Sequence, residues 1–102
     1  MDDRVARVLV VAKVLVADGM MTPEEKGFLD RIMGKLELDD AQRAKVHDLE
    51  GLDEAETVTA ALPEADRRAL VDEVLEAALI DGKLSPHETE AVAKLTAALD
   101  LD

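Results

Sequence analysis

DGMMTPEE, at Asp18–Glu25, returns 63 positions later as DGKLSPHE, at Asp81–Glu88. The likeness continues beyond these segments, because LELD at 36–39 is matched by LDLD at 99–102. A motif that recurs at a fixed offset indicates a duplicated structural unit. We therefore predict that residues 7–39 and 70–102 are two copies of one supersecondary unit.

Each quoted segment contains signals that end one helix and begin another. The Asp-Gly pair ends a helix, because glycine readily adopts the left-handed conformation that follows a helix C-terminus. Thr22-Pro23 and Ser85-Pro86 then supply a hydroxyl N-cap and a proline at the first helical position. A glutamate follows three residues after each cap and completes the capping-box pattern. The two segments thus predict two helical hairpins.

The 3.6-residue spacing of apolar side chains predicts about six helices and no strand. Residues 3–17 and 23–35 form the first hairpin. The second consists of a helix that follows Pro63 and stops at Asp81, and of a helix from Pro86 to about Leu99. Two shorter helices bridge the hairpins, one capped by Asp39 and ending near Gly51, the other capped by Asp53 and ending before Pro63. We predict a single all-α domain over 1–102, a bundle in which the hairpins pack across a pseudo-twofold axis.

The charge of the chain limits the classes of partner. Acidic residues number 24 against 12 basic ones, which gives a formal net charge of −12. Nucleic acids are bound through Lys and Arg and through stacking on aromatic rings, and Phe28 is the only aromatic residue. We expect protein partners and no nucleic acid, and the charge is compatible with hard cations and basic proteins.

Membrane insertion and catalysis are also not expected. The apolar run from Val8 to Ala17 is shorter than the roughly 20 residues that a spanning helix needs. Asp2 and Asp3 stand where a secretory signal would carry positive charge, so we expect a cytoplasmic protein. The chain has no cysteine, its only serine is the N-cap Ser85, and no phosphate-binding loop is present, so we expect no enzyme.

Glu25 and Glu88 have two interpretations that remain open. Each stands three residues after an N-cap, where its carboxylate can accept a hydrogen bond from the N-cap amide and stabilise the helix by about 1 kcal/mol. Each is also a candidate ligand for a cation, and capping does not exclude that role.

Asp18 and Asp81 are placed at helix C-termini, where the helix dipole disfavours an anion. Asparagine would suit the same turn without that cost. Hydrogen bonding of the aspartate side chains within the turn is one explanation for their presence. Ligation of a cation is the other.

The order of acid, glycine, apolar residue and closing glutamate matches the second half of an EF-hand loop. The earlier ligand positions of that loop are occupied by apolar residues in both copies: Ala77 and Leu79 in one, Val14 and Val16 in the other. Neither copy can therefore form a calcium loop alone.

A composite metal site is expected if the two turns lie on the same side of the bundle. Its ligands are four carboxylates: Asp18, Glu25, Asp81 and Glu88. Like charges held close together recruit a cation or raise a pKa, and oxygen ligands favour Ca²⁺, Mg²⁺ or Mn²⁺. His47 is expected at the surface or half-buried, and His87 is expected at the surface, where it is a weaker candidate for a fifth ligand.

The two turns resemble the paired ADGxx(S/T)xxE turns of TerB-like domains. The matching residues are Ala17-Asp18-Gly19 with Thr22-Pro23-Glu24-Glu25, and Ile80-Asp81-Gly82 with Ser85-Pro86-His87-Glu88. This family is named for a tellurite-resistance protein and includes the N-terminal domain of the co-chaperone DjlA. The resemblance covers nearly the whole chain. It implies an all-helical, non-enzymatic intracellular domain with a role in stress response or in scaffolding protein complexes. The family's acidic positions fall on Asp18, Glu25, Asp81 and Glu88.

Two functions follow as expectations. The favoured one is a small acidic TerB-like interaction module that binds divalent cations weakly at the paired Asp-Gly turns. The alternative is a dedicated divalent-metal-binding or metal-sensing protein, in which the cation is the function.

Overall fold

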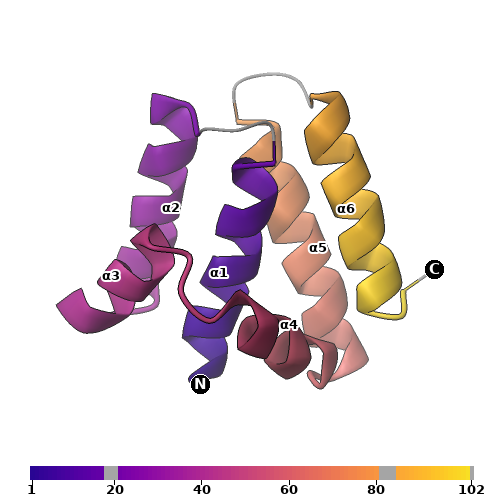
Figure 1. The fold of residues 1–102 in the computed structure, drawn as a ribbon, viewed down its shortest axis with the longest axis horizontal. Helices are drawn as coiled ribbons and strands as arrows, with labels where there is room; N and C mark the ends of the chain where they lie inside the picture. Colours follow the sequence, from indigo (N-terminus) through magenta and orange to yellow (C-terminus); the bar gives the residue numbers. More distant parts are fainter. Residues whose placement is uncertain (18–20, 81–84, 102) are drawn as a thin grey trace.

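The computed structural model describes residues 1–17, 21–80 and 85–101. These residues form six helices and contain no strand (Figure 1). The helices are α1 (Asp3–Leu15), α2 (Pro23–Lys35), α3 (Asp40–His47), α4 (Leu52–Ala60), α5 (Glu64–Ala78) and α6 (Pro86–Ala98). The prediction of an all-α bundle of about six helices is confirmed.

Helix α1 forms the centre of the bundle, between α2 on one side and α5 and α6 on the other (Figure 1). Its buried face is wider than a stripe of 3.6-residue spacing predicts, because Val10, Val11 and Val14 are buried together with the expected positions. The run VLVVA is apolar on every side, so the helix can be surrounded by its neighbours. It packs most extensively against α4 and α5.

The second helices of the two hairpins share their N-terminal structure at the 63-residue offset. Both α2 and α6 have 13 residues and start with proline. Thr22 with Glu25, and Ser85 with Glu88, form complete capping boxes in which the hydroxyl and the glutamate carboxylate both accept backbone amides.

The C-terminal ends of α2 and α6 are fixed by equivalent contacts as well. Glu37 and Asp100 both adopt a left-handed backbone with φ of 58°. Just before these residues, the guanidinium of Arg4 donates a hydrogen bond to the Leu36 carbonyl at 2.8 Å, and that of Arg67 donates to the Leu99 carbonyl. An arginine from the first helix of each hairpin therefore caps the end of the second.

The two bridging helices differ from the prediction at the end of α3 and at the start of α4. Helix α3 ends at His47 and not near Gly51, because Leu49 turns left-handed with φ of 52°. Helix α4 begins at Leu52, after Gly51 with φ of 84°, and has no side-chain N-cap. The prediction that Asp53 caps this helix was wrong, since it lies in the first turn.

The first helix of each hairpin is shorter than predicted. Helix α1 ends at Leu15 and α5 ends at Ala78, two and three residues before the expected ends at Ala17 and Asp81. The predicted Asp-Gly stops themselves lie outside the described residues. None of the described helices is both long and apolar enough to cross a membrane.

Candidate functional site

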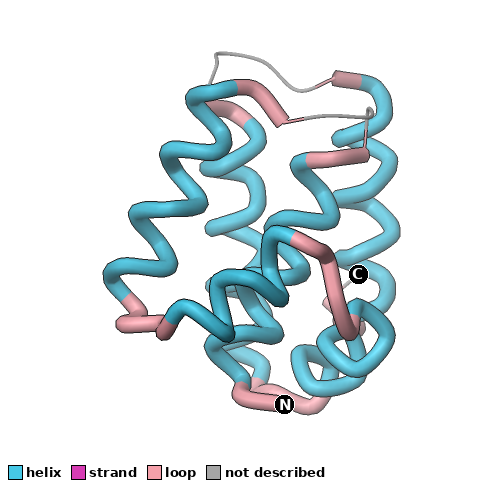
Figure 2. The backbone as a smooth tube through the Cα atoms, turned by 60° about the vertical axis from the view of Figure 1, so that its left-hand side comes forward, coloured by secondary structure: helices cyan, strands magenta, loops and turns pink. Residues whose placement is uncertain are grey.

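The helix ends that flank the two turns lie at the same end of the bundle, which is the condition that a composite site requires. The C-terminal ends of α1 and α5 and the N-terminal ends of α2 and α6 all lie at the top in Figure 1. Figure 2 shows the same arrangement after a rotation of 60°. The first turns of α2 and α6, which carry Glu25 and Glu88, therefore face the same region.

Glu25 and Glu88 both cap their own helices, as their spacing predicts. Glu25 Oε1 accepts a hydrogen bond from the Thr22 amide at 2.8 Å, and Glu88 Oε1 accepts one from the Ser85 amide at 3.0 Å. Each carboxylate thereby satisfies a backbone donor that the helix itself leaves free.

Capping alone does not explain why these two residues are glutamates. In α3 the same capping box is closed by Gln42, whose side-chain oxygen accepts the Asp39 amide at 2.9 Å. An amide therefore serves the cap equally well in this chain. Glu25 and Glu88 are moreover only 3% and 4% exposed, and no other ionisable side chain is buried among the described residues. Burial of a charge is unfavourable unless it gains a partner.

The carboxyl groups of Glu25 and Glu88 are neighbours. Burial is the largest cause that raises the pKa of Glu25, and the neighbouring Glu88 carboxyl with its negative charge raises this pKa further. The hydrogen bond from the Thr22 amide opposes the rise. A buried carboxyl group beside a second negative charge favours binding a proton or a cation, and this applies to Glu25.

One oxygen of this pair has no hydrogen-bond donor. Glu88 Oε2 is buried and receives no hydrogen bond from any described residue. A buried acceptor without a partner destabilises a fold by about 1–3 kcal/mol, and more when it is charged. The oxygen belongs to the carboxyl group whose charge raises the pKa of Glu25, so it is a free acceptor for a proton or a cation bound at this pair.

The structure brings together two of the four predicted metal ligands. Asp18 and Asp81 lie outside the described residues. Within residues 1–17, 21–80 and 85–101, no group of three or more His, Asp or Glu side chains is arranged to hold a metal ion. His47 and His87 are exposed, as predicted.

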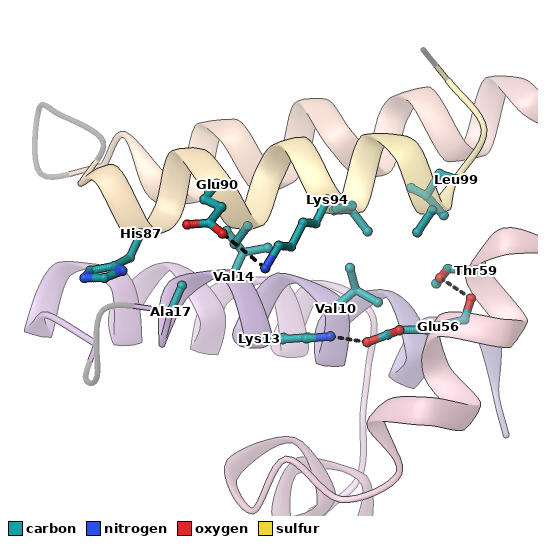
Figure 3. A pocket seen from close by; sticks show the side chains of 13 residues that line it. Val10, Lys13, Val14, Ala17, Glu56, Thr59, His87, Glu90, Lys94 and Leu99 are labelled. Atoms are coloured by element: carbon teal, nitrogen blue, oxygen red, sulfur yellow. Dashed lines mark hydrogen bonds and ion pairs between the residues drawn. The ribbon is translucent and has the colours of Figure 1, made fainter.

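A groove between α1, α4 and α6 was not predicted from the sequence. It has a volume of about 620 Å³, and the same groove is shown from close by in Figure 3. Its walls come from three helices that are distant in sequence, so no local motif marks it. The only signal along the chain is a lysine in each long wall, Lys13 in an apolar run of α1 and Lys94 in α6.

Comparison with protein-family models, with curated proteins and with solved structures finds no match to this chain. The resemblance to TerB-like domains therefore rests on the two turn motifs and their flanking helices.

Proposed function

We propose that this chain is a small acidic TerB-like interaction domain of the cytoplasm, in which a divalent cation binds between Glu25 and Glu88 and joins the two hairpins. One observation supports the cation site above all. Two buried carboxyl groups, from equivalent positions of the two repeats, meet with one oxygen unpartnered.

The chemistry of the pair favours a hard cation. Both groups offer oxygen, which suits Ca²⁺, Mg²⁺ and Mn²⁺ and not the softer metals. Mg²⁺ in particular binds through one or two carboxylates and keeps several of its own waters. Asp18 and Asp81 are the further ligands that the sequence proposes. A proton shared by the two carboxyl groups is the competing occupant.

The acidic surface supports the interaction role. With a net charge of −12, the domain attracts basic surfaces over a distance of about a Debye length. A cation that joins the first turns of α2 and α6 would hold the two hairpins in one arrangement and keep that surface in a fixed shape. A role in stress response or in scaffolding is proposed from the family resemblance alone.

The cation site is tested by titrating Ca²⁺, Mg²⁺ and Mn²⁺ into the metal-free protein, with backbone amide shifts as the readout for the diamagnetic ions and line broadening for Mn²⁺. We expect saturable changes centred on Thr22–Glu25 and Ser85–Glu88. Glu25→Gln retains the capping box, as Gln42 does in α3, and should weaken binding at least about tenfold, the effect of losing one charged ligand. Glu24→Gln, on the exposed neighbour, is the matched control.

Two results would remove the cation from the proposal. One is the absence of saturable shifts at either turn, which leaves the shared proton as the occupant. The other is equal binding by the parent and by Glu25→Gln. Asp18→Asn combined with Asp81→Asn tests the two outer ligands in the same assay. Unchanged cation binding would show that these aspartates serve the turns and do not bind the cation.

A dedicated divalent-metal-binding or metal-sensing protein is the second candidate. The near-complete burial of both carboxyl groups favours it, since a dry pair of charges gains most from a counter-ion. Saturation at micromolar cation would support this function, whereas saturation in the millimolar range would support the accessory site of an interaction domain.

A further inference from the structure

The groove between α1 and α6 has the volume needed to hold a small molecule. Its volume of about 620 Å³ lies within the range of about 300–1,000 Å³ that is typical of small-ligand sites. Helix α6 packs against α1 less extensively than α4 and α5 do, which leaves this space between them. Ala91 and Ala98 line it from α6, where larger side chains would fill it.

The groove has an apolar lining in its interior. Val10 and Val14 of α1, Leu95 of α6 and Leu99, which directly follows α6, line it, and each of them is no more than 9% exposed. These side chains offer no polar group to a ligand, so the part of a ligand that enters must itself be apolar.

The mouth of the groove is less acidic than the rest of the molecule. Two lysines, Lys13 and Lys94, line it together with two acids, Glu56 and Glu90, whereas acids outnumber Lys and Arg two to one over the chain. Lys94 extends from α6 across the groove toward α1, and Lys13 runs along α1 toward Glu56 (Figure 3).

Among the residues that the structure describes, both lysines are held by exposed ion pairs alone. Lys94 contacts Glu90 at 3.2 Å, with both side chains more than 60% exposed, and Lys13 contacts Glu56 at the rim. Exposed ion pairs contribute about 0–1 kcal/mol, so an incoming anion can exchange with either glutamate at little cost.

The shape of the groove favours a compact ligand. Helix α4 crosses its end near Leu99, where Glu56 and Thr59 line the wall (Figure 3). The Thr59 hydroxyl already donates to the carbonyl oxygens of Ala55 and Glu56 in its own helix. A partner helix running along the groove would meet α4, whereas a short chain ends before it.

We propose that this groove binds a monocarboxylate with a single hydrocarbon chain, the chain lying on Val10, Val14 and Leu95 and the carboxylate meeting Lys13 and Lys94. The apolar interior selects the chain, and the two lysines at the mouth select an anionic head group. This site is separate from the paired turns, and it depends on neither Glu25 nor Glu88.

Decanoate is the probe, with decanol and decyltrimethylammonium as head-group controls of the same chain length. We expect saturable amide shifts at Val10, Val14 and Leu95 with decanoate, and affinity about tenfold lower for decanol, which lacks the charge-assisted contact. Equal binding of decanol, or tighter binding of the cationic amphiphile, would overturn the proposal.

Two pairs of variants locate the site. Lys13→Gln with Lys94→Gln should lower decanoate affinity about tenfold and leave decanol affinity unchanged, whereas the exposed Lys35→Gln with Lys45→Gln should change neither. Ala91→Leu fills the groove with little change in helix propensity and should abolish binding, and Ala93→Leu, on the exposed side of α6, should not. Ala91→Leu adds apolar contacts, so it keeps the test valid if the lysine variant fails to fold.

If Ala91→Leu binds decanoate as tightly as the parent protein does, the hydrocarbon chain lies elsewhere and the assignment of the groove is overturned. Glu25→Gln should bind decanoate as the parent does, so the fate of the cation site leaves this result unaffected.

Discussion

Glu25 and Glu88 complete the capping boxes of α2 and α6, as Gln42 completes that of α3. Unlike a typical surface cap, both glutamates are buried. The capping role could be predicted from the sequence, because it depends only on a spacing of three residues. Their burial and mutual contact could not be predicted, because these depend on how the ends of two helices 63 residues apart meet. No local pattern encodes that meeting.

Without metal, the pair should make stability depend on pH in a defined direction. The pKa of Glu25 is raised by burial and by Glu88, so the folded state holds a proton that the unfolded chain releases near the ordinary value of 4.5. The stabilisation is complete below that value and is lost as the pH rises through the higher folded-state pKa. Urea unfolding of the parent and of Glu25→Gln, in chelator from pH 4 upward, should show the glutamine variant gaining relative stability as the pH rises.

The difference between the two proteins isolates Glu25 from the other acids, and Glu24→Gln provides the baseline for an exposed glutamate. A difference that stays constant over this pH range would show that the pKa of Glu25 is not raised in the folded state.

The hydroxyl caps should matter about equally in the two repeats. Thr22→Ala and Ser85→Ala each remove the acceptor for the amide of the glutamate that follows, and each should lower the free energy of unfolding by about 1 kcal/mol. Thr89→Ala, on the exposed side of α6, serves as the comparison. A clearly larger loss at one cap would mean that the two turns support the fold differently.

At the level of helices, the existence of α1 could be predicted from the sequence, but its central place in the bundle could not. Its existence and its start at Asp3 could be predicted from apolar spacing and N-terminal acids. Its place at the centre of the bundle depends on contacts with α4 and α5 that no single helix reveals. The ends of α3 and α4 were harder to predict because Leu49 and Gly51 adopt left-handed conformations, and a leucine gives no sequence signal for one.

Truncation in α1 should therefore be more damaging than truncation in α6. Leu9 is fully buried, and Leu9→Ala should lower the free energy of unfolding by about 2–5 kcal/mol. Val92 of α6 is half-buried, and Val92→Ala should have a clearly smaller effect. Denaturant unfolding measures both, and similar losses would contradict the central position of α1.

Over the whole molecule, the matched bounds, caps and arginine contacts of the two hairpins predict that 7–39 and 70–102 superpose. An experimentally determined structure checks this prediction through the crossing angles of the two helix pairs. Clearly different crossing angles would show that the two segments share only their capping residues and are not two copies of one structural unit.

The excess of acidic residues should make the fold sensitive to salt. With a net charge of −12, self-repulsion subtracts from the stability, and screening relieves it. We expect the melting temperature to rise from very low salt to moderate NaCl, and to rise further with Mg²⁺ at equal ionic strength. Glu25→Gln should keep the NaCl response and lose the additional Mg²⁺ response. A melting temperature independent of NaCl would exclude electrostatic strain.

The contact between Glu25 and Glu88 has a consequence for the origin of the chain. They stand 63 positions apart in matching motifs, and if the two hairpins are copies of one unit, a residue that neighbours its own counterpart lies near the axis of a twofold assembly. In an ancestral homodimer of single hairpins, this glutamate would have faced itself across the dimer axis. Two like charges there would have needed a proton or a metal ion between them, so the shared occupant would predate the fusion of the two halves into one polypeptide.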